Sequence, residues 1–217
     1  MDFALPNATS LGLFVSAALA LLLVPGPAVL YLVGRSIEQG RTAGLVSIAG
    51  IHAATVFHVL AAALGLSALL ASSALAFAIV KYAGAAYLIW MGLRKLFAPV
   101  PGLATGAPAL ARHSNWRLFR DGFIVNLLNP KTALFFLAFL PQFVDVALGH
   151  VAVQIFTLGI LFTALGLVTD TSYAMAAGIA GSWLRGNRSY LRFERYFSGF
   201  LYIGLGVTAA LAGNGKK

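Results

Sequence analysis

Two proline signatures, Pro25-Gly26-Pro27 and Asn129-Pro130-Lys131, each interrupt a long apolar stretch of this chain. A proline inside a helix removes one backbone N–H donor and displaces a carbonyl group. In hydrocarbon every backbone polar group must find a partner within the protein, so a broken membrane helix must face protein or a water-filled cavity. Paired breaks in the two halves of a membrane chain mark a binding site. The two signatures therefore predict a buried polar site beside them.

The apolar stretches are long enough for several membrane spans. The chain has 217 residues, of which 60% are hydrophobic and 10% charged, with a mean hydropathy of +0.88. One span needs only about 20 apolar residues. We expect an all-α, polytopic membrane protein with about six spans, at 10–34, 43–70, 74–97, 118–143, 152–183 and 194–213. No Lys or Arg precedes the first span, so we expect a mature helix there rather than a signal peptide.

The basic residues predict the orientation of these spans. Eleven of the fifteen Lys and Arg residues fall in or beside the first, third and fifth loops. By the positive-inside rule these loops are cytoplasmic and both termini lie outside. Attraction of the same loops to anionic lipid accounts for the net charge of +9, so we expect the lipid bilayer, and no nucleic acid, as a partner.

The region of the first break resembles that of the second. Residues 22–32 align with residues 127–137 through matching leucine, proline and alanine positions. We therefore expect one three-helix half at 1–97, a cytoplasmic linker at 98–117 rich in Pro, Gly and basic residues, and a second half at 118–217. Three spans per half is an odd number, which makes an inverted repeat with the site between the halves.

Both breaks carry candidate substrate-binding residues. In the first, Pro25, Gly26 and Pro27 would free backbone carbonyls and the N–H groups of a half-helix, whose positive end suits a carboxylate; a purely structural kink is the alternative. The second break has two amides, a proline and a cation, and Lys131 is the strongest single candidate because a charge at mid-membrane is costly. Its alternative is snorkelling to the surface. The residues of the second break are Asn126, Asn129, Pro130 and Lys131.

Three further residues are candidates for proton coupling. Asp170 lies on a narrow stripe of small and polar residues along the fifth span, where it can carry a proton or pair with Lys131. His52 and His58 share one side of the second span, and histidine titrates near neutral pH. Static, hydrogen-bonded contacts are the alternative for all three. The small-residue stripe can pack within one chain or across a homodimer.

Other classes of function find little support in the residues. The chain has no cysteine, no H-E-x-x-H motif and no G-x-S-x-G element, so we expect neither an enzyme nor a cofactor. Metal export favours clustered carboxylates or histidines. Here these residues are scattered, so we expect no metal site, although export of a divalent metal ion or another small solute stays the alternative function.

The chain closely resembles the LysE (lysine exporter) family, particularly its homoserine/threonine exporter branch. The resemblance rests on Pro25-Gly26-Pro27, on the run from Asn126 to Lys131 before an aromatic-rich span, on the basic linker and on the length. It implies a multi-pass permease of the bacterial inner membrane that exports amino acids or their derivatives, of homoserine, threonine or lysine type, by proton antiport. It does not name the substrate.

Overall fold

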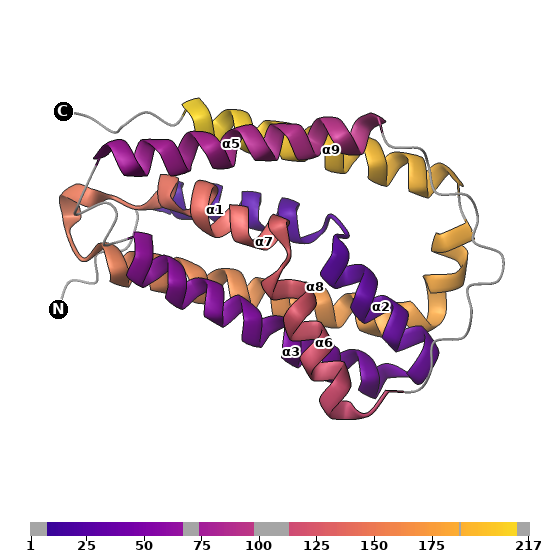
Figure 1. Ribbon diagram of the computed structural model, residues 1–217. Coiled ribbons are helices and arrows are strands. Elements are labelled where there is room, and N and C mark those ends of the chain that lie inside the picture. Colours follow the sequence, from indigo (N-terminus) through magenta and orange to yellow (C-terminus); the bar gives the residue numbers. More distant parts are fainter. Residues whose placement is uncertain (1–7, 67–73, 98–112, 187, 212–217) are drawn as a thin grey trace.

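The computed structural model describes residues 8–66, 74–97, 113–186 and 188–211 (Figure 1). The described residues form helices, which confirms the expected all-α, polytopic membrane protein. The elements are α1 (Ala8–Leu22), α2 (Pro27–Gln39), α3 (Arg41–Ala61), η1 (Ala62–Leu66), α5 (Ala74–Phe97), α6 (Asn115–Leu127), α7 (Pro130–Leu134), η2 (Phe135–Phe139), η3 (Leu140–Phe143), η4 (Val146–Leu148), α8 (Val151–Gly186) and α9 (Arg188–Leu211).

Both proline signatures break a span, as predicted. Helices α1 and α2 meet at 53°, and α6 meets the segment that begins with α7 at 48°. Pro27 and Pro130 stand at the first turns of α2 and α7, where a missing N–H costs no helical hydrogen bond. The break in the second half is capped, because the backbone N–H of Lys131 donates to Oδ1 of Asn129 over 3.1 Å.

The helices fall in the ranges expected for the spans. Among the described residues, Arg41–Gly65 and Val151–Ala177 are each long and apolar enough to cross a membrane, as is each bent pair taken as one span. Helices α5 and α9 have 24 residues each, about 36 Å of helix, but they are not among the spans that length and apolarity support in the described residues, so the expected number of about six stays a prediction. The last helix begins at Arg188 rather than 194. Most of the predicted linker 98–117 lies outside the described residues, and its end already belongs to α6.

The helices form two outer layers, and one part of each broken span lies between them. In Figure 1, α5 and α9 run antiparallel along one side, and α3 and α8 run along the other, with α1 and α7 between. Helix α3 also packs against α2 and α6, and α2 packs against α8. Gly40 makes the sharp turn from α2 into α3, for which its positive φ of 85° favours glycine.

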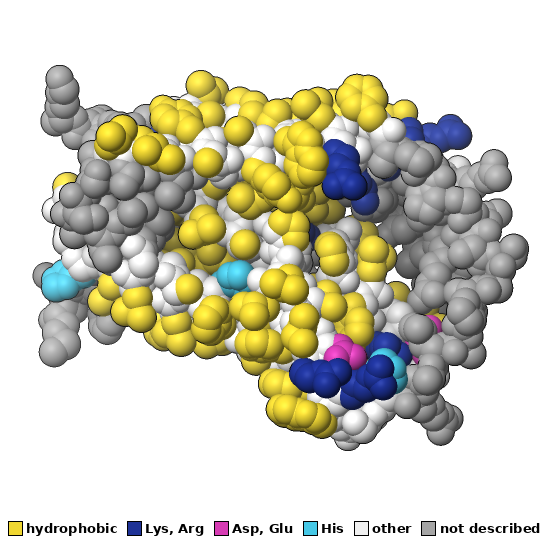
Figure 2. All heavy atoms as spheres, in the orientation of Figure 1, with side chains coloured by type: hydrophobic (Ala, Val, Ile, Leu, Met, Phe, Trp, Pro, Cys, Tyr) yellow, Lys and Arg dark blue, Asp and Glu magenta, His cyan; other side chains and the backbone are white. Residues whose placement is uncertain are grey.

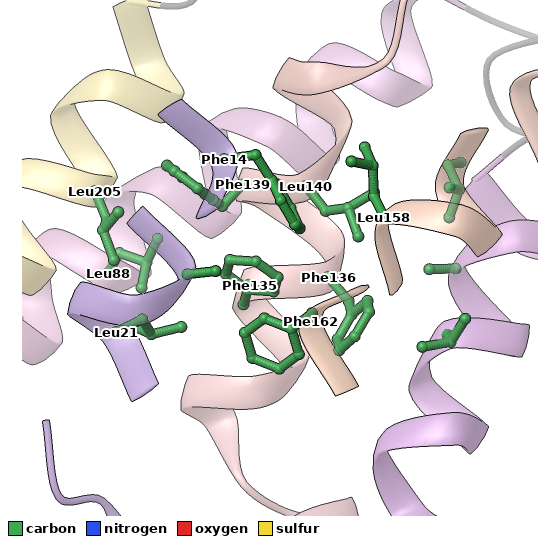
Figure 3. Close-up of a cluster of buried hydrophobic side chains, with 14 of the residues drawn as sticks. Phe14, Leu21, Leu88, Phe135, Phe136, Phe139, Leu140, Leu158, Phe162 and Leu205 are labelled. Atoms are coloured by element: carbon green, nitrogen blue, oxygen red, sulfur yellow. The ribbon is translucent and has the colours of Figure 1, made fainter. Parts of the chain in front are cut away.

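An aromatic cluster fills the space beside the broken helices. Phe135 of η2 stacks on Phe162 of α8 with ring centroids 4.2 Å apart, and Phe14 of α1 and Phe139 of η2 pack around Phe135 (Figure 3). Offset and tilted rings of this kind add to the gain from burial. The cluster holds α1, η2 and α8 together at one end of the site described below.

The outer surface matches the two environments of a membrane protein. Hydrophobic side chains cover most of the face in Figure 2, and Lys and Arg gather toward one end of the bundle. At that end α2 and the start of α6 are joined by the amide of Gln39, which donates to the His113 carbonyl oxygen and accepts from the His113 backbone N–H. Burial, with the nearby charges of Arg35 and Arg117, lowers the pKa of His113 and favours its neutral form.

Glycines allow two helix pairs to approach very closely. A Cβ at Gly50 of α3 would lie 2.0 Å from the Phe119 carbonyl oxygen of α6, and one at Gly122 of α6 would lie 2.6 Å from the Ser47 carbonyl oxygen of α3. Gly92 of α5 and Gly199 of α9 are equally close to one another's helices. Small residues are the usual means by which membrane helices come into backbone contact.

We predict that Gly50→Ala destabilises the protein because the added methyl group meets backbone rather than a flexible side chain. Overpacking of this kind costs about 1–3 kcal/mol. The measurement is the thermal unfolding midpoint of the purified protein in detergent. Gly34→Ala on α2 is the matched control, because a Cβ there meets nothing within 4 Å. Equal midpoints for the two variants would contradict the close α3–α6 contact.

Candidate functional site

A narrow cavity lies between the two helix breaks. Its volume is about 40 Å³, room for about three water molecules. Six helices contribute to its lining, which contains apolar side chains together with amides, hydroxyls and charges. The lining residues are Leu21, Leu22, Gly26, Ala28, Val29, Ile51, His52, Thr55, Asn126, Asn129, Lys131, Thr132, Phe162 and Asp170.

Side chains from the second half bind the carbonyl groups that the first break frees. The Nζ of Lys131 donates to the Val24 carbonyl oxygen over 2.5 Å, and the Tyr173 hydroxyl donates to the Leu23 carbonyl oxygen over 2.8 Å. Lys131 is 7% exposed, so it does not snorkel to the surface. Gly26 lets this side chain approach, since a Cβ there would lie 3.2 Å from Cδ of Lys131.

An amide network fixes the second break against α3. The Nδ2 of Asn126 donates to the Ile51 carbonyl oxygen over 2.8 Å and to Oγ1 of Thr55 over 2.9 Å. Its Oδ1 accepts from Nδ2 of Asn129 and from Oγ1 of Thr132. These buried donors and acceptors satisfy one another, as a site inside hydrocarbon requires. The network therefore sets where α7, and with it Lys131, begins.

A buried acid and a buried histidine face each other across α3 and α8. Oδ2 of Asp170 lies 3.1 Å from Nε2 of His52, and these residues are 6% and 8% exposed. Gly166 makes room for the imidazole, since a Cβ there would lie 2.9 Å from Cε1 of His52. Nδ1 of His52 is buried and has no hydrogen-bond partner among the residues that the structure describes. The partner of Asp170 in this contact is thus a histidine, which the sequence did not indicate.

The predicted site residues divide into two groups. Gly26, Asn126, Asn129, Lys131, His52 and Asp170 come together in the cavity lining. Pro25, Pro27 and Pro130 shape the breaks but are not among the lining residues. His58 stacks on Phe136 and has its Nε2 3.3 Å from the Asn126 carbonyl oxygen, and it too is not among them.

The small-residue stripe on α8 packs within the chain. A Cβ at Gly159 would lie 2.6 Å from Cγ1 of Val59, and Gly166 and Asp170 face His52. These residues therefore meet α3 of the same chain. The predicted stripe runs along α8 from Gly159 to Gly181. Gly181 lies in a part of α8 whose side chains are not described.

Several contributors to the site were not predicted, among them Thr132, Phe162 and Tyr173. Thr132 bonds the amide network, Phe162 joins the cavity to the aromatic cluster, and Tyr173 binds a freed carbonyl oxygen. Tyr173 shares the predicted stripe with Asp170, so its position there is the signal that could have identified it. Phe162 carries no comparable signal, because an apolar residue in an apolar span is indistinguishable from its neighbours.

Known proteins resemble this chain over nearly its whole length. A homoserine/homoserine lactone efflux protein of Salmonella typhimurium is 34% identical over 88% of this chain and 90% of its own length. An uncharacterized membrane protein of Vibrio cholerae is 30% identical over 92% of this chain and 95% of its own length. A membrane protein of Bacillus subtilis is 26% identical over 94% of this chain. No solved structure matches it.

The family comparison covers both breaks and the cavity between them. The family model described as LysE type translocator matches residues 19–213, which include every residue of the cavity lining. A translocator is the class of protein that a buried, charged cavity between broken membrane helices favours. The chain therefore belongs to the family of LysE type translocators.

Proposed function

We propose that this protein exports small amino acids or their derivatives, of the homoserine type, across the bacterial inner membrane in exchange for protons. The observation that carries the proposal is that a buried cation, Lys131, and a buried anion, Asp170, line one cavity at the helix breaks. The name of the Salmonella relative supports the substrate class. The distribution of basic residues supports the orientation, with the basic end in the cytoplasm.

Lys131 is proposed to bind the substrate carboxylate. Its ammonium group now donates to the Val24 carbonyl oxygen, and a carboxylate is the stronger acceptor for a charged donor. The first N–H groups of α2, beside Ala28 and Val29 in the lining, carry the positive end of that helix dipole. Both features favour an anionic group at this side of the cavity.

Asp170 and His52 are proposed to carry the coupling proton. Both side chains are buried, in contact, and on the same cavity as Lys131. His58 was predicted to take part as well. Its Nε2 contacts the Asn126 carbonyl oxygen, so His58 would connect to the cavity through Asn126. The halves 1–97 and 118–217 are proposed to form the inverted repeat, and their contacts through α3, α6, α8 and α2 support it.

The competing function is export of a divalent metal ion. A buried ammonium group on the cavity disfavours it, because Lys131 would repel a metal cation at short range and offers no lone pair while charged. An organic zwitterion meets no such repulsion. The lining therefore favours amino acids over metals.

We predict that Lys131→Ala lowers export about 10- to 100-fold while leaving the amount of inserted protein unchanged. A charged hydrogen bond is worth about 1.5–3 kcal/mol, and that energy sets this range. The assay is uptake of labelled homoserine into inverted vesicles, with the protein quantified in the same membranes. Lys95→Ala, at the end of α5, is the matched control and keeps full activity. Normal transport by Lys131→Ala would exclude the proposed role of this residue.

We also predict that transport into inverted vesicles depends on an acidic lumen and stops when a protonophore removes the pH gradient. Homoserine, threonine and lysine are the first substrates to compare. The same strains are challenged with toxic divalent metal ions. Metal resistance without amino-acid transport would reverse the assignment in favour of metal export.

A further inference from the structure

We propose that Asp170 binds the ammonium group of the substrate, and that this ammonium group and a proton on His52 compete for Asp170. Each exported amino acid is thereby exchanged for one proton. The inference rests on the proposed export of amino acids and gives its cavity a recognition rule: the ligand must be a zwitterion with an unblocked amino group.

The charges on the cavity wall match the two ends of an amino acid. Lys131 offers only donors, and an ionised Asp170 offers only acceptors. An α-amino acid carries a carboxylate and an ammonium group, so each end finds one partner. A ligand that lacks the ammonium group offers no cation to the buried carboxylate of Asp170, and a buried charge without compensation is costly.

Asp170 is the single acidic side chain in the cavity lining, among the residues that the structure describes. It is 6% exposed, so water compensates little of its charge. One buried carboxylate balances one positive charge well, and a second cation beside it would be a buried, uncompensated charge. An imidazolium ring and a substrate ammonium group therefore exclude each other at this site.

The two ring nitrogens of His52 differ in their surroundings, because Nε2 contacts Asp170 and Nδ1 does not. With Nε2 3.1 Å from the carboxylate, the hydrogen-bond network assigns the ring proton of the neutral form to this nitrogen. Nδ1 is buried and unpartnered, and its lone pair accepts the coupling proton. When the substrate ammonium group binds Asp170, the Nδ1–H bond breaks and the proton passes to water. No other covalent bond changes.

The surroundings of the pair contain other groups that carry charge or titrate. Lys131 shares the cavity with the pair. Other groups of the helices packed around the pair lie outside the cavity lining, among them His58 of α3, Tyr31 and Arg35 of α2, Asp121 of α6 and Tyr173 of α8.

The direction of exchange follows from where His52 holds its proton. On the less acidic cytoplasmic side the ring is neutral more often, and Asp170 receives the substrate. On the more acidic outer side a proton returns to Nδ1. The imidazolium ring then pairs with Asp170, so the substrate ammonium group is released. The proton gradient then drives substrate outward.

The test measures ligand binding to the purified full-length protein between about pH 5.5 and 8.5. Homoserine is compared with 4-hydroxybutyrate, which keeps the carboxylate and hydroxyl but lacks the amino group. For the wild type, the Kd of homoserine rises up to about tenfold for each unit that the pH falls, because proton and ligand compete. The Kd of 4-hydroxybutyrate does not follow this pattern, and homoserine binding releases one proton.

Two variants separate the roles of the pair. In His52→Gln the Kd of homoserine no longer depends on pH, and proton release is lost. The Asp170→Asn variant loses the wild-type preference for homoserine over 4-hydroxybutyrate, a ratio of Kd values of about tenfold or more. Retained binding of 4-hydroxybutyrate shows that each variant is folded. Ser172→Ala is the control, since this exposed residue of α8 bonds only the Val168 carbonyl oxygen of its own helix.

Three results would overturn the proposal. If wild-type binding of homoserine does not vary with pH, or if His52→Gln keeps the wild-type dependence, competition is excluded while amino-acid export stands. If Asp170→Asn keeps the preference for homoserine, the ammonium group binds elsewhere. If the protein binds no amino acid at any pH, both this inference and the proposed function fail.

Discussion

The chemistry of the cavity depends on the bond between the Lys131 ammonium group and the Val24 carbonyl oxygen. It joins the two helix breaks, because the donor lies just after one and the acceptor just before the other. Inside a membrane each break alone would leave backbone groups unpaired. When the two breaks lie together, groups from one bond groups from the other, and this arrangement buries the charge of Lys131. That charge is what gives the cavity between the breaks its chemistry.

Further hydrogen bonds around this bond hold the two breaks in position. Asn126 and Asn129 hold the start of α7, which carries Lys131, while Tyr173 binds the neighbouring Leu23 carbonyl oxygen. The side-chain donors of Asn129 and Tyr173 reach acceptors across the second break and on another helix. The positions of α1, α6 and α8 are therefore coupled to the site, and a change in one charge there is felt by helices from both halves of the chain.

Sequence reasoning predicted the all-helical fold and the sites of both breaks, because prolines and long apolar runs leave few alternatives. It also identified Lys131, His52 and Asp170, since a charged or titratable residue in an apolar span stands out. It could not pair His52 with Asp170, which lie 118 positions apart and meet only through the packing of α3 on α8. Phe162 was missed because its role comes from position alone, and the linker 98–117 is still a prediction for the most part.

The glycine contacts between helices have a consequence for motion. Gly50 and Gly122 bring α3 and α6 into backbone contact, and Gly92 and Gly199 do the same for α5 and α9. Close-packed pairs of this kind resist deformation, so each pair can be treated as one block. Each block contains one helix from each half of the chain. Alternating access here would thus rotate these blocks, each made of helices from both halves, about the proline breaks. Rocking one half as a unit against the other would instead have to separate the glycine contacts between α3 and α6 and between α5 and α9.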